Sequence, residues 1–441
     1  IFANHLKYKP DSIQRALIVY VDFKDCRADG EYNEFCELVK STGLEIVSTI
    51  KTTRLRADAR LFIGVGKAEE IRVTAEKYDA DVVIFNRLLT PAQERNLEMF
   101  FGIRVIDRIG LILDIFAQRA LSYEGKLQVE LAQLQHLTTR LIRGWTHLER
   151  QKGGIGLRGP GETQLETDRR LIGRRIKAIK ERIQKVRKQR YQSRQQRKKQ
   201  NIPVISFVGY TNAGKSTLFN YLTDANVKVE DQLFATLDPT LRRINTDNGN
   251  DIILTDTVGF IRDLPHELIE SFKATLDEVK EADLLIHIID VDQEQRQQRI
   301  DEVNQVISVI GASHVAQIEV YNKIDMHSAQ KRRIEISENN KITRIWLSSR
   351  TGEGVDLLLE AMNRYLNKHK RPHYINIPVS AGQLRAKLFD IGAVKQENID
   401  DMGGWVMKVE LEEYKLHKLC KEANLDMSNI AVERCSLLTS I

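Results

Sequence analysis

The length, composition and charge of the chain exclude several classes of protein. Its 441 residues, 42% hydrophobic and 29% charged, have the balance of a folded soluble protein with about three domains. No stretch of about 18 apolar residues occurs, so a transmembrane segment is not expected. The four cysteines form no CxxC pair and no metal-ligand spacing, which favours reduced thiols in a cytoplasmic protein. The first residues show no secretory pattern and no initiator Met, which leaves open an N-terminus upstream.

The net charge of +6 is unevenly distributed along the chain. Residues 169–200 hold fifteen Lys or Arg and one acidic residue, Glu181, so this segment carries +14 and the remainder carries −8. An acidic protein with one basic segment is a candidate for binding a polyanion there. The alternative is that the segment is only the solvated face of a helix. We favour contact with an anion, because a merely solvated helix usually mixes charges of both signs.

Residues 13–110 alternate strand-like and helix-like segments, which predicts a parallel sheet with helices on its faces. The predicted strands are 15–21, 44–49, 81–85 and 104–106, and the predicted helices are 32–40, 67–78 and 91–99. Residues 64–66 are rich in glycine, but they lack the second glycine that a phosphate loop needs. We interpret them as a plain turn.

Residues 111–200 change to a helical pattern. Apolar residues recur at steps of mostly three or four from Leu127 to Leu148, and a second series runs from Leu165 to Val186. Two long amphipathic helices with a short link between them are predicted to pack antiparallel, as a helical hairpin. Beyond Val186 the apolar series stops, and we predict a basic linker.

The link between the two helices, residues 151–161, contains five glycines, one proline and two basic residues, and no acid. A hairpin needs only a few residues to turn, so this longer basic tip predicts a finger that enters RNA. The candidate contacts to phosphates and bases are Arg143, Trp145, Arg150, Lys152 and Arg158. Two alternatives stay open: the tip is a mobile connector, or Trp145 packs in the apolar stripe of its helix.

The strongest motif of the chain lies in residues 201–370. The sequence GYTNAGKS at 209–216 is a G-x-x-x-x-G-K-S phosphate loop between a predicted strand, 203–208, and a predicted helix, 217–222. The glycines let backbone N–H groups point at a phosphate, and the helix adds its positive end. Lys215 is predicted to contact the β- and γ-phosphates, and the Ser216 hydroxyl to bind Mg²⁺. The predicted nucleotide-binding residues are Gly209, Tyr210, Thr211, Asn212, Ala213, Gly214, Lys215 and Ser216.

Two further segments are predicted to surround the γ-phosphate. Thr236 is placed to be the second direct ligand of Mg²⁺, as in a switch segment. Asp256 follows a predicted strand and is expected to reach Mg²⁺ through water, while the Gly259 N–H binds the γ-phosphate. The predicted catalytic residues are Lys215, Thr236 and Gly259. The nucleotide-binding residues predicted in these segments are Phe234, Ala235, Thr236, Leu237, Asp238, Asp256, Thr257, Val258 and Gly259.

Two motifs at strand ends predict that the base is guanine. The Asp325 carboxylate can accept two N–H bonds from the guanine edge, whereas adenine would leave it unpaired. Residues 348–350 can present backbone N–H groups to the guanine O6. The residues concerned are Asn322, Lys323, Ile324, Asp325, Ser348, Ser349 and Arg350. All of these motifs, in this order, predict an enzyme that hydrolyses GTP to GDP.

The residue after Gly259 is Phe260, where small GTPases carry a Gln that orients the attacking water. Phenylalanine neither donates nor accepts a hydrogen bond. The water must therefore be positioned by the backbone, by a bound cation or by a partner, and we expect slow intrinsic hydrolysis.

Residues 371–441 predict a small α+β unit without a chemical motif. The chain is thus expected to be an α/β multidomain protein with four parts. These are an N-terminal parallel α/β domain at 1–110, a long antiparallel helical hairpin with its basic tip and linker at 111–200, a P-loop GTPase domain at 201–370 and the C-terminal unit.

These motifs resemble those of translation-factor-related GTPases and, more closely, those of the HflX family. The resemblance is carried by residues 143–150, 153–169, 209–217, 234–240 and 256–262. It covers nearly the whole chain, and it is weakest after Arg371. The hairpin-tip sequence makes it specific to this family.

The resemblance implies a cytoplasmic, ribosome-associated GTPase, monomeric, with loose membrane association left open. It implies binding of GTP and GDP, dependence on Mg²⁺, contact with the large (50S) ribosomal subunit and its rRNA, and stimulation by the ribosome. Splitting or rescue of stalled ribosomes under stress is the implied output, with the hairpin reaching toward the peptidyl-transferase centre. Asn212 matches an Asn that binds K⁺ in related GTPases, so K⁺ is a further candidate cofactor. Family members have N-terminal domains reported to act on RNA and ATP, but no second phosphate loop occurs here.

The sequence leaves two other classes of function open. One is a signalling switch that contacts a protein effector, with a basic segment that is merely solvated. Steep salt dependence of binding to large subunits would disfavour it. The other is an RNA-binding scaffold whose nucleotide only regulates affinity, which multiple-turnover stimulation of GTP hydrolysis would disfavour.

Overall fold

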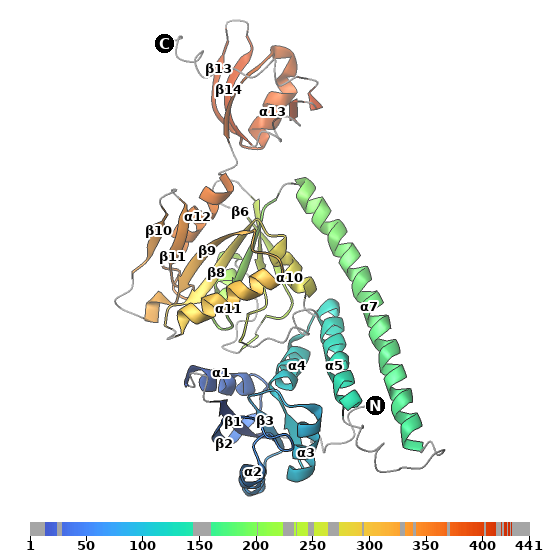
Figure 1. Ribbon diagram of the computed structural model, residues 1–441. Coiled ribbons are helices and arrows are strands. Elements are labelled where there is room, and N and C mark those ends of the chain that lie inside the picture. Colours follow the sequence, from blue (N-terminus) through green and yellow to red (C-terminus); the bar gives the residue numbers. More distant parts are fainter. Residues whose placement is uncertain are drawn as a thin grey trace. The chain divides into compact units, whose positions relative to one another are not determined.

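Figure 1 shows a computed structural model of the chain, coloured from the N-terminus to the C-terminus. The chain divides into two compact units, Ile1–Ile244 with Ile252–Glu353, and Asn245–Asp251 with Gly354–Ile441. No helix among the described residues is both long enough and apolar enough to cross a bilayer. The described residues are 14–23, 29–143, 160–200, 202–223, 233–234, 236–245, 251–262, 273–292, 295–326, 331–337, 341–367, 371–400, 403–411, 416, 419–420, 422–423 and 425.

The first unit begins with a fully parallel sheet, as predicted. Its strands lie in the order β2-β1-β3-β4, and every adjacent pair is parallel. Successive residues of β1 pack into two different core clusters, because alternate side chains of a strand point to opposite faces. The strands are β1 (Arg15–Phe23), β2 (Glu45–Arg54), β3 (Val82–Phe85) and β4 (Arg104–Ile106), and the helices are α1 (Asp29–Lys40), α2 (Val65–Lys77) and α3 (Pro91–Phe101).

The predicted antiparallel pair of long helices is present as α5 (Tyr123–Arg143) and α7 (Pro160–Gln200). Leu127 and Leu131 of α5 pack against Ile179 and Ile183 of α7. The ion pairs Glu124–Arg190 and Glu130–Arg175, each 2.7 Å, flank this seam. A residue late in α7 thus pairs with one early in α5, which is the antiparallel order.

The structure adds one helix that was not predicted in this region and corrects one expectation. A separate helix, α4 (Arg108–Arg119), precedes the pair, and it begins where the Asp107 side chain accepts a hydrogen bond from the Gly110 N–H at 2.9 Å. The sequence pattern did not separate it from α5. The basic segment after Val186, expected to be a linker, is helical to Gln200. Its Lys, Arg and Gln residues have high helix propensity, which continues the helix after the apolar seam ends.

The GTPase part is a seven-stranded sheet in the order β10-β11-β9-β8-β5-β7-β6. The pairs from β11 to β7 are parallel, and β10 with β11 is antiparallel. The half-exposed strands β6 and β10 lack the apolar runs that predicted the others. The strands are β5 (Val204–Gly209), β6 (Thr240–Asn245), β7 (Asp251–Asp256), β8 (Leu284–Asp290), β9 (Ala316–Asn322), β10 (Arg333–Ile336) and β11 (Ile342–Trp346), and the helices are α8 (Lys215–Thr223), α10 (Lys273–Lys280) and α11 (Arg296–Val309).

One apolar core runs through the first unit. It joins Ile18 of β1 and Phe116 of α4 to Phe234, Leu237 and Val258 of the GTPase part. The rings of Phe116 and Phe234 meet edge to face with their centroids 4.7 Å apart. The GTPase part therefore shares its interior with the N-terminal elements.

The second unit contains α12 (Val355–Asn367) and a small antiparallel sheet in the order β12-β14-β13. Apolar residues of the sheet pack with Leu384 and Leu388 of α13 (Gly382–Asp390). Its strands are β12 (Arg371–Ile377), β13 (Val394–Ile399) and β14 (Trp405–Leu411). This confirms the predicted α+β unit.

Candidate nucleotide-binding site

The phosphate loop begins where the buried strand β5 ends. Gly209 has φ +149°, and a Cβ there would lie 2.3 Å from the Ile288 carbonyl oxygen. Gly214 has φ +95°, and its Cβ would lie 2.2 Å from Asn322 Nδ2. Neither position has room for a side chain, so the path of the loop requires both glycines.

Lys215 lies under this loop with its side chain buried. Its ammonium donates to the Tyr210 carbonyl at 2.7 Å and to the Gly209 carbonyl at 3.2 Å. Burial lowers the pKa of Lys215 to about 8, and nearby Asp256 opposes this shift. A buried ammonium held against the loop is suited to stabilise phosphate charge.

Three predicted metal ligands converge beside the loop. Ser216 Oγ donates to Asp256 Oδ2 at 2.6 Å and lies 2.8 Å from Thr236 Oγ1. Thr236 Oγ1 donates to the same Oδ2 at 3.0 Å. Ser216 lies in the first turn of α8 and Asp256 ends β7, so the fold brings separate parts of the chain to one point.

The donor set of these three residues fits Mg²⁺. Asp256 is fully buried, and this burial raises the pKa of its carboxyl group. Its Oδ1 has no hydrogen-bond partner among the described residues. A buried carboxylate oxygen without a partner, next to two hydroxyl oxygens, is a site for a hard cation that takes oxygen ligands.

Gly259 lies against the phosphate loop. A Cβ on Gly259 would meet Thr211 Cγ2 at 2.8 Å and Lys215 Nζ at 2.9 Å. The next residue, Phe260, donates its N–H to the Gly209 carbonyl at 3.1 Å and accepts from the Thr211 N–H at 2.8 Å. Its ring is buried in the core. The side chain after Gly259 thus packs in the interior.

Asn322 joins the predicted guanine-recognition segments to the phosphate loop. Its Nδ2 donates to the Ala213 carbonyl at 2.8 Å, and its Oδ1 accepts from the Ser349 N–H at 2.8 Å. Ser348 Oγ donates to Asp325 Oδ1 at 2.6 Å, which orients that carboxylate. The three segments therefore form one connected group.

Asp290 also lies among the predicted guanine-recognition segments, and it was not predicted from the sequence. Lys323 has the left-handed φ of +69°, and its ammonium pairs with Asp290 Oδ2 at 2.8 Å. Asp290 is the last residue of β8, which neighbours β9 in the sheet. An acidic residue at the end of a buried strand was the available signal.

The residues of the predicted nucleotide-binding segment 234–238 have different surroundings in the structure. Thr236 alone reaches Ser216 and Asp256, whereas Phe234 and Leu237 are buried in the core. Asp238 accepts hydrogen bonds from residues 121 and 122. Ala235 lies outside the described residues.

The remaining predicted residues have varied surroundings. Thr257 and Val258 are buried behind the loop, Ile324 is buried in the 3-10 helix Ile324–Met326, and Asn212 (φ +59°) and Arg350 are exposed. Arg143 ends α5, but its side chain is not described. The other RNA-contact candidates, Trp145, Arg150, Lys152 and Arg158, lie outside the described residues.

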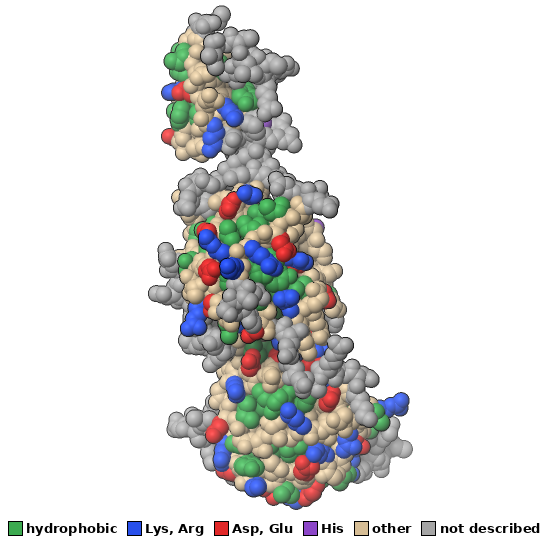
Figure 2. All heavy atoms as spheres, turned by 90° about the vertical axis from the view of Figure 1, so that its left-hand side faces the viewer, with side chains coloured by type: hydrophobic (Ala, Val, Ile, Leu, Met, Phe, Trp, Pro, Cys, Tyr) green, Lys and Arg blue, Asp and Glu red, His purple; other side chains and the backbone are tan. Residues whose placement is uncertain are grey.

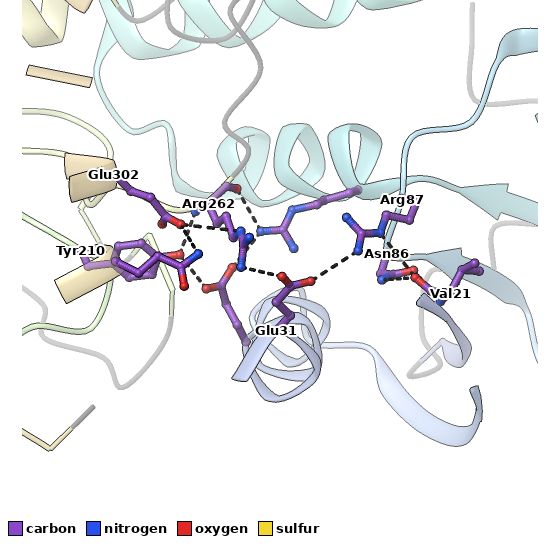
Figure 3. Close-up of polar contacts among 10 residues, drawn as sticks. Val21, Glu31, Asn86, Arg87, Tyr210, Arg262 and Glu302 are labelled. Carbon is purple, nitrogen blue, oxygen red and sulfur yellow. Dashed lines mark hydrogen bonds and ion pairs between the residues drawn. The ribbon is translucent and has the colours of Figure 1, made fainter. Parts of the chain in front are cut away.

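Residues of the N-terminal part contact the site through a polar network that the sequence did not reveal (Figure 3). The Tyr210 hydroxyl donates to Glu34 Oε2 at 2.6 Å and accepts from the Arg262 N–H at 2.8 Å. The Arg262 guanidinium pairs with Glu31 at 2.5 Å and with Glu302 at 3.6 Å. Glu31 and Glu34 lie on α1, whose sequence has no signal for this contact.

Three family models match consecutive segments of the chain. They describe a GTP-binding GTPase N-terminal region (residues 29–117), a GTP-binding GTPase middle region (119–197) and a 50S ribosome-binding GTPase (204–323). Among solved structures, a GTP-binding protein from the archaeon Sulfolobus solfataricus in complex with GDP has a TM-score of 0.44 and 22% identity, with 80% of this chain and 99% of that chain covered.

Curated relatives match over most of their length. GTPase HflX of Escherichia coli is 49% identical over 412 residues, which cover 93% of this chain and 97% of the relative. GTPase HflX of Caldanaerobacter subterraneus subsp. tengcongensis is 45% identical over 390 residues, covering 88% of this chain and 89% of the relative. Together with the phosphate loop and the guanine motifs, these matches show that the chain belongs to the HflX family of GTPases.

Proposed function

We propose that this GTPase acts on the large ribosomal subunit, and that hydrolysis is linked to splitting or rescue of stalled ribosomes. The observation that carries the ribosomal part is the match of residues 204–323 to the 50S ribosome-binding GTPase model. The basic helix α7 supports contact with rRNA, because phosphate contacts dominate the affinity of proteins for nucleic acids.

Most of the described basic side chains of α7 lie on the surface that α5 leaves uncovered. Ile179 and Ile183 are buried against α5, and Arg175 and Arg190 pair with glutamates of α5. The other exposed basic residues of the helix are Arg169, Arg170, Arg174, Lys177, Lys180, Arg182, Lys185, Arg187 and Lys188. The face of the molecule in Figure 2, by contrast, mixes basic and acidic side chains over its described surface. This difference favours α7 as the rRNA contact, together with the tip residues 151–161.

In the proposed site, Ser216 and Thr236 would bind Mg²⁺ directly, and Asp256 would bind it through water. The ion would neutralise the negative charge that develops on the phosphates. Lys215 and the loop N–H groups stabilise the same charge, and the Gly259 N–H binds the γ-phosphate. Asp325 and the segment 348–350 read guanine.

We further propose that intrinsic hydrolysis is slow and that the ribosome accelerates it. The burial of Phe260 supports this, since a ring packed in the core does not orient water. K⁺ bound near the exposed Asn212 is a second source of assistance, and equal hydrolysis rates in KCl and NaCl would argue against it.

The four-part organisation at 1–110, 111–200, 201–370 and 371–441 is part of the proposal. So are a monomeric state and a cytoplasmic, ribosome-associated location. Sedimentation of the purified chain with and without large subunits tests the state and the association together, and a pellet lost steeply with rising salt indicates phosphate contacts.

The deciding experiment measures GTP hydrolysis with and without purified large ribosomal subunits. It runs beside a variant in which residues 153–161 are replaced by a short neutral linker. Strong stimulation of the intact chain is expected, with stimulation retained and ribosome splitting lost in the variant. A fast basal rate that large subunits leave unchanged would overturn the proposal and favour a signalling switch.

A further inference from the structure

Asp238 binds the N-terminal end of α5, the first helix of the long antiparallel pair. Its Oδ2 accepts from the N–H groups of Leu121 and Ser122 at 2.9 and 2.7 Å, and its Oδ1 accepts from Ser122 Oγ at 2.5 Å. Ser122 Oγ itself accepts from the Gly125 N–H at 2.9 Å, as a helix cap does. One carboxylate therefore takes three donors from the turn that starts α5.

Asp238 lies two residues after Thr236, which contacts Ser216 and Asp256 at the metal-ligand cluster. Two residues of extended chain span about 7 Å at most, so the position of Asp238 restricts that of Thr236. On the other side of Thr236, Phe234 is fixed against Phe116. Thr236 is thus held between two anchors on the N-terminal elements.

We propose that Asp238 is a positioning residue for GTP hydrolysis. By binding the first turn of α5, it places the Thr236 hydroxyl at the metal-ligand cluster. Coupling between two sites is reciprocal, so the nucleotide state must act on the first turn of α5 in return. The inference rests on the proposed role of Thr236 as a Mg²⁺ ligand.

Gly125 offers a way to test the anchor without changing Asp238. A Cβ at Gly125 would lie 2.2 Å from Asp238 Oδ1, so an alanine there displaces the carboxylate. Alanine is a better helix former than glycine, so the substitution does not lower the helix propensity of α5, although the same Cβ would also lie 3.1 Å from Ser122 Oγ. Gly173 in α7 is the matched control, because nothing lies within 4 Å of its Cβ position.

The experiment compares full-length Gly125→Ala and Gly173→Ala with the parent chain, without ribosomes. For Gly125→Ala we expect kcat to fall about tenfold, which corresponds to the loss of one charge-assisted hydrogen bond. The Mg²⁺ concentration that gives half-maximal hydrolysis should rise several-fold. The KM for GTP should stay within about twofold, because the guanine contacts do not involve Asp238. Gly173→Ala should match the parent.

A second variant, Asp238→Asn, keeps the shape of the side chain but accepts fewer bonds. It should change kcat in the same direction and accelerate hydrogen exchange at the Leu121 and Ser122 amides in the presence of a non-hydrolysable GTP analogue. Parent-like kcat and Mg²⁺ dependence in Gly125→Ala, or equal losses in Gly173→Ala, would overturn the inference. A parent chain that hydrolyses no GTP would instead contradict the proposed function.

Discussion

The hydroxyl of Tyr210, in the phosphate loop, donates a hydrogen bond of 2.6 Å to Glu34, on α1 of the N-terminal part. The same oxygen accepts from the backbone N–H of Arg262, three residues after Gly259. The Arg299 guanidinium lies 4.5 Å from the centre of the ring. Burial is the main reason that the pKa of Tyr210 is raised, so the hydroxyl keeps its proton. One side chain therefore links the phosphate loop, the segment after Gly259 and the N-terminal sheet domain.

Replacing this hydroxyl tests the link. Tyr210→Phe leaves Glu34 and the Arg262 N–H without their shared partner, so the free energy of unfolding should fall by about 1–3 kcal/mol. Urea denaturation followed by circular dichroism measures this. Tyr321→Phe is the matched control, because its hydroxyl bonds the half-exposed Glu319 at 3.0 Å. Equal, small changes in both variants would show that the network adds nothing to stability.

The orphaned oxygen of Asp256 predicts how hydrolysis depends on the metal. Asp256→Asn removes the negative charge from the ligand cluster, and kcat should fall by about 10² or more. Titration of hydrolysis with Mg²⁺ should show a much weaker apparent affinity for the ion. Asp301→Asn, on the exposed face of α11, should leave both values unchanged. Normal Mg²⁺ dependence in Asp256→Asn would remove Asp256 from the metal site.

The bond from Ser348 to Asp325 predicts how the base is selected. Inosine triphosphate lacks the 2-amino group of guanine, so it leaves one of the carboxylate's two bonds unmade. The chain should bind GTP about tenfold or more tightly than this analogue. In Asp325→Ala the preference should disappear together with most of the affinity. A variant that still distinguishes the two nucleotides, in a competition assay with fluorescent GDP, would place guanine recognition elsewhere.

The buried ammonium of Lys215 predicts a pH dependence of binding. Burial lowers its pKa to about 8 in the nucleotide-free protein. Bound phosphates stabilise the charged form and raise this pKa again. Binding therefore takes up a proton above about pH 8, and affinity for GDP should fall there by up to about tenfold per pH unit.

Fluorescence titration with GDP between pH 7 and 9 tests this dependence. Lys215→Met, which has no titrating group, should bind weakly at every pH and show a flat profile over this range. The same slope in both proteins would assign the pH effect to another group.

The site was largely predictable because its motifs are local. A phosphate loop needs its strand, glycines and helix within a short stretch, and the carboxyl ends of parallel strands meet at one edge of a sheet. Asp256 and Asn322 could therefore be placed at the same edge of the sheet from their positions at strand ends. The alternating pattern of residues 13–110 likewise predicted the parallel sheet.

What the sequence did not predict depends on contacts between distant residues. The bonds of Tyr210 to Glu34 and of Asp238 to Ser122 join residues 176 and 116 positions apart. In the sequence Glu34 resembles an ordinary surface charge, and the motif that contains Asp238 predicted nucleotide binding rather than a contact with residues 121 and 122. The boundary between α4 and α5 was missed for a related reason. The turn that starts α5 at Ser122 is stabilised by Asp238, which belongs to the GTPase part of the chain.

The edge-to-face contact of Phe116 with Phe234 has a consequence for dissecting the protein. A fragment that starts at β5 would carry Phe234 and Leu237 on its outside, and the remaining fragment would carry Phe116. Large apolar side chains exposed in this way favour aggregation. If the chain were cut once between α7 and β5, the two pieces should remain attached and elute together in gel filtration.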